Sequence, residues 1–201
     1  MRQTLDSDTR AVMALLRGAI TVSGLPQGTF ARAMGTSASR FSTYLAGSTR
    51  PSAHFCLRAQ RLSRSLEAAA EAGLMSAPAA ADALRQQIRA DSREWAWRML
   101  LQGRDHLRVM LSKQHDDLLG SWEAAPTSTG SVEYDALLAA LTRHEFEASG
   151  RTAPDWTNIE PLPAPWVPEH PFLSRQRAMA KTPDWLKELN IFVPGRDLVT
   201  A

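Results

Sequence analysis

Residues 24–52 read GLPQGTFARAMGTSASRFSTYLAGSTRPS and predict two short helices joined by a tight turn. The first helix should run from about residue 26 to residue 34, because Phe30, Ala31 and Met34 are spaced to share one apolar face. Gly35 follows directly and can adopt the left-handed conformation that a sharp reversal of the chain needs.

The second helix should cover Ser37–Ala46. Ser37 can cap its N-terminus, while Phe41, Tyr44 and Leu45 form its inward face. Gly47 ends the helix. Two helices set at a steep angle by a short glycine turn have the geometry of a helix-turn-helix, whose second helix can enter the major groove of DNA.

The same stretch resembles the Cro/lambda-repressor (Xre-like) helix-turn-helix family. The resemblance rests on GLPQ at 24–27, FA at 30–31, Gly35, TS at 36–37, FS at 41–42, Tyr44, Gly47 and RPS at 50–52. Two positions depart from it: Gly28 weakens the first helix by about 1 kcal/mol relative to Ala, and Leu45 stands where the family often has Glu. The resemblance covers about a third of the chain, with residues 11–20 as a leading helix and residues 52–71 closing the core.

The resemblance implies a DNA-binding domain, and the helix pattern selects its contact residues. The aromatic residues of the second helix lie on its inward face, so the polar residues between them should face the major groove of DNA. Their hydroxyl and guanidinium groups can read base edges. The starts of the two helices should hold phosphates. The expected DNA-binding residues are Gln27, Ser37, Ser39, Arg40, Ser42, Thr43 and Arg50. The alternative is that these helices are simply packed and have no nucleic-acid role.

Composition suits a cytoplasmic protein of one or two modest cores. The chain has 201 residues, 44% hydrophobic and 22% charged, with a net charge of only +2, so local clustering would have to carry any affinity for DNA. Cys56 is the single cysteine, which excludes an intrachain disulfide and a thiolate metal cluster. The apolar run near the N-terminus is broken by Arg17, so no secretory signal is expected, and no run is long enough to span a membrane.

We predict a mainly α fold with two domains. Residues 1–75 should form the helix-turn-helix domain, and residues 76–201 a helical region for dimerisation or partner binding. The second region should begin with a long helix, 78–122, whose apolar face includes Trp95 and Met99. Such a face must be covered by the C-terminal part of the chain or by a second subunit. We expect a homodimer, since relatives of this head usually bind DNA as symmetric pairs, but a helix wholly inside its own monomer remains possible.

The last third should contain a helix that Ser131 caps and Gly150 ends, and then a proline-dense strap at 154–168. Two short helices should follow at about 174–180 and 182–189. An extended stretch, 190–195, should follow them. Four large aromatic side chains are concentrated in the final quarter: Trp156, Trp166, Trp185 and Phe192. They could merely seal the core of the monomer, or residues 190–198 could dock as an extended segment on a partner or on the sister subunit.

The strings YDALLAALTRHE, PDW, PW and TPDWLKELNIFVPGRDL resemble the C-terminal region of actinobacterial Xre-type regulators. Some proteins similar to these are antitoxins paired with nucleotidyltransferase-like or other toxins. The resemblance therefore implies two alternatives: a transcriptional regulator, in the first instance a repressor, or an antitoxin-like module that neutralises a protein encoded next to it.

An enzyme is not expected. The sequence RHEFE at 143–147 lacks the second histidine, one helical turn away, that would complete a zinc-binding face. The glycine spacing contains no phosphate-binding loop, and no nucleophile stands beside an obvious base. We therefore expect no cofactor and no metal.

Overall fold

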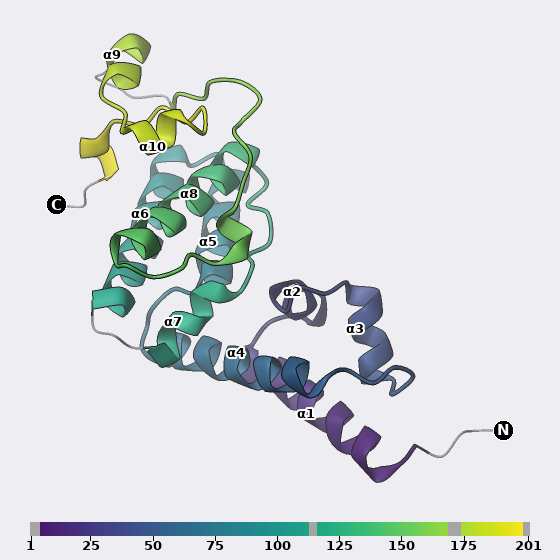
Figure 1. Ribbon diagram of the computed structural model, residues 1–201. Helices are drawn as coiled ribbons and strands as arrows, with labels where there is room; N and C mark the ends of the chain where they lie inside the picture. Colours follow the sequence, from purple (N-terminus) through teal and green to yellow (C-terminus); the bar gives the residue numbers. More distant parts are fainter. Residues whose placement is uncertain (1–4, 113–115, 169–173, 199–201) are drawn as a thin grey trace. The chain divides into compact units, whose positions relative to one another are not determined.

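The computed structural model describes residues 5–112, 116–168 and 174–198 (Figure 1). These residues form helices and connecting loops, so the predicted mainly α class is confirmed. The α-helices are α1 Ser7–Ser23, α2 Gln27–Ala33, α3 Ala38–Leu45, α4 Ala53–Glu71, α5 Ala77–Arg89, α6 Arg93–Ser112, α7 Asp116–Glu123, α8 Val132–Ala148, α9 Arg175–Ala180 and α10 Asp184–Lys187. Two 3₁₀ turns, η1 Asp155–Thr157 and η2 Gly195–Leu198, complete the described secondary structure.

The chain divides into two compact units. The first contains Met1–Ala79 and Met110–Thr127, and the second contains Ala80–Val109 and Ser128–Ala201. The sequence had suggested a boundary at residues 75 and 76. The structure differs because a later segment, which includes α7, belongs to the first unit.

The first unit is built on α4, against which α1 and α7 pack. The α7 helix fits closely: a Cβ added at Gly120 would lie 2.5 Å from the Ser65 hydroxyl oxygen on α4. Trp122 is completely buried, and its indole N–H donates to the carbonyl of Met75 at 2.9 Å. Leu16 of α1 and Leu62 of α4 belong to the main core of this unit.

The prediction of one long helix over 78–122 was wrong. The α5 helix ends at Arg89, and the chain turns at Asp91, which has a left-handed φ of 51°. The Ser92 amide donates to the carbonyl of Gln87, and the Asp91 amide donates to that of Ile88, so the turn is a Schellman motif with aspartate in the position usually held by glycine. The predicted helix is therefore broken between α5 and α6.

The second unit contains α8, whose residues from Ala136 to Thr142 are all buried. Ser131 caps this helix by accepting from the Tyr134 amide, as the sequence indicated. The proline-dense strap that follows is bonded to the chain after α10: the Leu162 amide donates to the Leu189 carbonyl at 3.0 Å, and Trp166 and Ile191 form a parallel β-bridge. The strap is thus held in place by backbone hydrogen bonds.

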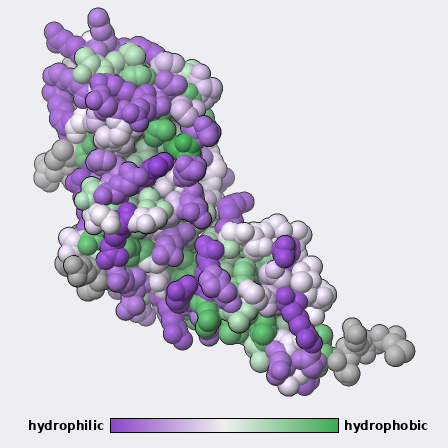
Figure 2. Space-filling view, in the orientation of Figure 1, coloured by the Kyte–Doolittle hydropathy of each residue, from purple (hydrophilic) through white to green (hydrophobic). Residues whose placement is uncertain are grey.

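The tail, residues 190–198, is extended only over 191–194, because η2 begins at Gly195. Asn190 has a left-handed φ of 58°, so it belongs to the turn after α10. Ile191, Val193 and Leu198 are buried within the second unit. Figure 2 shows that the visible face of the protein is mostly hydrophilic, with small hydrophobic areas between the polar side chains.

Candidate nucleic-acid interface

The α2–turn–α3 segment forms the predicted helix pair. The turn after α2 is another Schellman motif: the Thr36 amide donates to the Ala31 carbonyl at 3.0 Å, and the Gly35 amide donates to the Arg32 carbonyl at 2.8 Å. Gly35 has a φ of 69°, which a residue with a side chain adopts only at a cost. Ser37 then accepts from the Arg40 amide and begins α3.

Aromatic rings fix the angle of α3 on the rest of the unit. Phe41 is fully buried, with its ring 5.8 Å from Phe30 on α2 and 6.2 Å from Phe55 on α4. Tyr44 meets Phe55 edge-on at 5.2 Å. Because these rings occupy the inner side of α3, the residues between them are directed outward.

The outward face of α3 is polar. Ser39, Arg40 and Ser42 are exposed, and Thr43 is half-buried. The hydroxyl of Thr43 donates to the Arg40 carbonyl at 2.7 Å, and that of Ser42 donates to the Ala38 carbonyl at 2.9 Å. These groups can still accept hydrogen bonds from a ligand, because each hydroxyl oxygen has two lone pairs.

Two side-chain contacts hold this face in one arrangement. Gln27, the first residue of α2, donates from its amide nitrogen to the Ser42 hydroxyl at 3.0 Å. The guanidinium of Arg40 donates through Nε to the Tyr44 hydroxyl at 2.8 Å. Its two Nη groups remain directed away from that bond, so Arg40 can form a two-pronged contact with a base or a phosphate.

Ser37 lies at the start of the same face. Its hydroxyl is 3.1 Å from that of Ser39, and it also accepts from the Arg40 amide. The structure therefore brings together six of the seven predicted DNA-binding residues: Gln27, Ser37, Ser39, Arg40, Ser42 and Thr43.

The seventh, Arg50, lies in the loop after α3 and is paired within the protein. Its Nη2 is 2.8 Å from Oδ2 of Asp6, and the Arg50 side chain is 80% exposed. Asp6 also caps α1, where it accepts from the amide and the hydroxyl of Thr9, each at 2.8 Å. The Thr9 amide, then the Thr9 hydroxyl and Arg50, lower the pKa of Asp6 to about 2. One nitrogen of the Arg50 guanidinium is therefore engaged by this carboxylate, and its other N–H donors are available to a phosphate.

The structure adds one residue that sequence reasoning missed. The Arg58 guanidinium on α4 lies beside the α2–α3 turn, because a Cβ added at Gly35 would be 3.9 Å from its Nη1. A sequence signal for it exists: between Thr9 and Leu66 the chain has eight arginines and no Asp or Glu. This acid-free run gives the helix-turn-helix a local positive charge that the whole-chain net charge of +2 conceals.

The six residues predicted for a partner or dimer interface lie in the second unit. Trp95 is 51% exposed, and the Arg98 guanidinium lies 4.8 Å from its ring centre. The other five are half-buried: Met99, Trp156, Trp166, Trp185 and Phe192. Two of these rings have aromatic contacts within their own unit: Trp166 meets Tyr134 edge-on at 5.6 Å, and Trp185 stacks on His144 at 4.2 Å.

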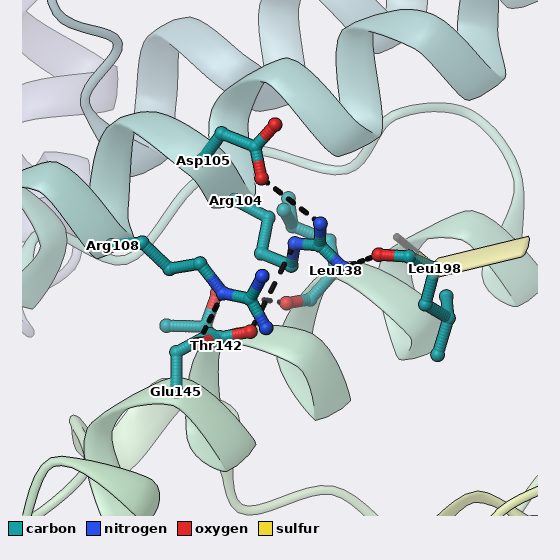
Figure 3. A network of polar contacts seen from close by, with 7 residues as sticks. All are labelled: Arg104, Asp105, Arg108, Leu138, Thr142, Glu145 and Leu198. Carbon is teal, nitrogen blue, oxygen red and sulfur yellow. Dashed lines mark hydrogen bonds and ion pairs between the residues drawn. The ribbon is translucent and has the colours of Figure 1, made fainter. Parts of the chain in front are cut away.

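A buried network of charges joins α6, α8 and the tail (Figure 3). Arg104, only 3% exposed, donates to the carbonyl of Leu198 and to Oδ1 of Asp105, the latter at 2.9 Å. Its Nε lies 3.9 Å from Oε1 of Glu145, while Nε of Arg108 donates to the other oxygen of Glu145 at 2.8 Å. The bond to Glu145 raises the pKa of Arg108. This network fixes the end of the tail on the second unit.

Among the described residues, no group of three or more His, Cys, Asp or Glu side chains could hold a metal ion. None of the described helices has both the length and the apolar character needed to cross a membrane. A comparison of the chain with protein-family models, with curated proteins and with solved structures finds no match.

Proposed function

We propose that this protein is a sequence-specific DNA-binding transcriptional regulator that acts as a dimer, in the first instance a repressor. The observation that carries the proposal is the α3 helix, which is held by buried aromatic rings on one side and presents Ser39, Arg40 and Ser42 to solvent on the other. A helix of this kind, preceded by a tight turn and a second helix, can place its outer face in a major groove.

Charge supports the same proposal. DNA affinity depends chiefly on cations placed against phosphates. The acid-free run from Thr9 to Leu66 includes Arg40 on α3 and Arg58 beside the turn. The exposed N-terminus of α3 adds backbone N–H groups and a positive helix dipole next to Ser37. Together these groups would bind the phosphates of the DNA backbone on both sides of the groove.

The test is a DNA-binding titration of the full chain on the promoter region of its own gene, at several salt concentrations. Replacing Ser42 and Thr43 by Glu should abolish specific binding, with a loss of at least about 100-fold, because two carboxylates would face the phosphates. Arg40→Ala should cost about 1–3 kcal/mol if its guanidinium reads a base. Unchanged affinity in the double Glu variant would refute the assignment of α3.

The matched control carries the same charge change elsewhere. Ala70 and Ala72 are exposed at the end of α4. At 1.5 Å per residue they lie roughly 20 Å along the helix from Phe55, which contacts α3. Glu at both positions should leave most of the affinity intact. Far-UV circular dichroism of both double variants would verify that the helices are retained.

A dimer follows from the number of contacts that one such helix can make. A single recognition helix gives little selectivity, whereas two heads about 34 Å apart read the half-sites of a palindrome. Trp95 and Met99 are one helical turn apart on α6, and the exposed Trp95 ring makes this the best candidate for part of the dimer surface. Sedimentation of the free protein and of its DNA complex measures the oligomeric state directly. A monomer in both samples would refute the proposed dimer.

The second candidate is an antitoxin-like module that binds a protein encoded by a neighbouring gene and uses DNA only for autoregulation. The same exposed Trp95, with Arg98 over its ring, favours it, because aromatic and arginine side chains are typical anchors of protein interfaces. Co-expression with the adjacent gene product distinguishes the two candidates. If the protein is an antitoxin-like module, the two proteins should co-purify, and Trp95→Ala should weaken that co-purification. Variants of α3 should still bind the partner.

A further inference from the structure

The second unit contains a cavity of about 890 Å³, a volume within the range of small-molecule sites. Its walls come from the α5–α6 turn, the first turns of α6 and α8, the strap and the tail. Four aromatic side chains line it, and all of them are half-buried: Trp97, Tyr134, Trp166 and Phe192. None of the four residues is fully buried, so each can offer surface to a ligand.

The charged groups of the lining differ in whether they are already paired. Arg196 lies 3.3 Å from Asp197, and Arg93 is engaged in an interaction within the protein. Glu94 bonds to Arg98 at 2.6 Å. Asp91 lines the cavity as well, is exposed, and has no ion pair among the described residues. A ligand can therefore meet the Asp91 carboxylate without breaking an ion pair, whereas an anion would have to compete for guanidinium groups that are already engaged.

We propose that this cavity binds an organic cation with an aromatic or other apolar body. The negative faces of aromatic rings attract an ammonium group, and the attraction is larger where the group is partly desolvated. The Asp91 carboxylate supplies the charge opposite the ammonium, and the ring surfaces cover the apolar body of the ligand. No residue of the α2–α3 interface lines this cavity, so cation binding can be tested independently of DNA binding.

The experiment is isothermal titration calorimetry of the full chain with benzyltrimethylammonium, compared with phenylacetate, an anion of similar size and ring content. We expect saturable binding of the cation at millimolar concentration or below, at least about tenfold tighter than that of phenylacetate. Absence of saturable cation binding, or equal binding of the anion, overturns the proposal.

Two variants with matched controls locate the site. Asp91→Asn removes the charge and keeps the turn, because Asn also tolerates a left-handed φ. It should weaken cation binding at least about threefold, while Glu188→Gln, at an exposed position outside the cavity, should not. Trp97→Leu should also weaken binding, whereas Val132→Ala, at an exposed apolar position outside the lining, should leave it unchanged. If Asp91→Asn binds the cation as tightly as the unmodified protein, the site is elsewhere and the proposal is wrong.

Discussion

Alanine substitutions at two glycines with the same backbone conformation should differ in how much they destabilise the protein. Gly35 and Gly47 have φ values of 69° and 71°, so alanine at either position meets the same left-handed strain, about 1–2 kcal/mol. Their surroundings differ. A Cβ added at Gly35 has only Arg58 Nη1 nearby, at 3.9 Å, whereas one added at Gly47 would lie 2.9 Å from Met13 Sδ and 3.0 Å from Thr9 Cγ2.

The neighbours of Gly47 cannot all give way. The Met13 thioether can rotate, but Thr9 is buried, and its hydroxyl is held by Asp6 at 2.8 Å. Overpacking of such a site costs about 1–3 kcal/mol. We therefore expect Gly35→Ala to lower the free energy of unfolding of the first unit by about 1–2 kcal/mol, and Gly47→Ala by about 2–5 kcal/mol.

Urea denaturation of the full chain, followed by far-UV circular dichroism, measures the difference between the two variants. Gly35→Ala is the internal control, because it has the backbone strain without the steric contact. Losses equal to within about 0.5 kcal/mol, or a larger loss for Gly35→Ala, would refute the reasoning from packing around Gly47.

Arg104→Met should lower the stability of the second unit by about 1–3 kcal/mol in urea denaturation, because it leaves the buried Leu198 carbonyl without its donor, while Glu145 keeps its bond to Arg108. Arg108→Met, at a side chain that is 49% exposed, should cost clearly less, and the opposite order would contradict the role given to Arg104. The Asp6 carboxylate, with a folded pKa of about 2 against 3.8 for the free side chain, should stabilise the first unit fully above about pH 4 and lose that effect as the pH falls towards 2. Asp6→Asn can keep the cap but should flatten this part of the pH–stability curve, and a curve of unchanged slope would count against it.

Local signals predicted most of the helix ends. Ser37 and Ser131 each accept a backbone N–H at the start of a helix, as their sequence contexts suggested, and Ser52 and Ser174 do the same. The sequence also indicated Gly35 as a turn residue, because a left-handed conformation is a property of a single residue and glycine adopts it readily. Such features need no knowledge of distant parts of the chain.

The break between α5 and α6 was not predictable in this way. Asp91 adopts the left-handed conformation that glycine usually supplies. Because no glycine marks the turn, the apolar spacing on both sides of Asp91 predicts one continuous helix. The association of α7 with the first unit depends on the close approach of Gly120 to Ser65 and on the burial of Trp122, which are contacts between segments far apart in sequence. Periodicity carries no information about them.

The residues of the candidate interface also differ in whether the sequence alone could predict their positions. The outward residues of α3 follow from helix geometry once Phe41 and Tyr44 are placed inside, so the sequence could name Ser39 and Ser42 correctly as exposed. It could not predict that Arg58 lies next to the turn, nor that Arg50 is paired with Asp6 across 44 positions of the chain. The buried Arg104 network joins positions that are up to 94 residues apart, and it too appears only in three dimensions.

The α3 helix is held mainly by buried aromatic side chains, while the serine side chains that it displays are exposed. Phe41 and Tyr44 belong to the aromatic cluster, whereas Ser39 and Ser42 are exposed. Substitutions at the displayed positions can therefore accumulate in descendants of this gene without unfolding the domain. Under the proposed function, a new DNA-sequence preference could evolve in single mutational steps, each of them nearly neutral for the stability of the fold.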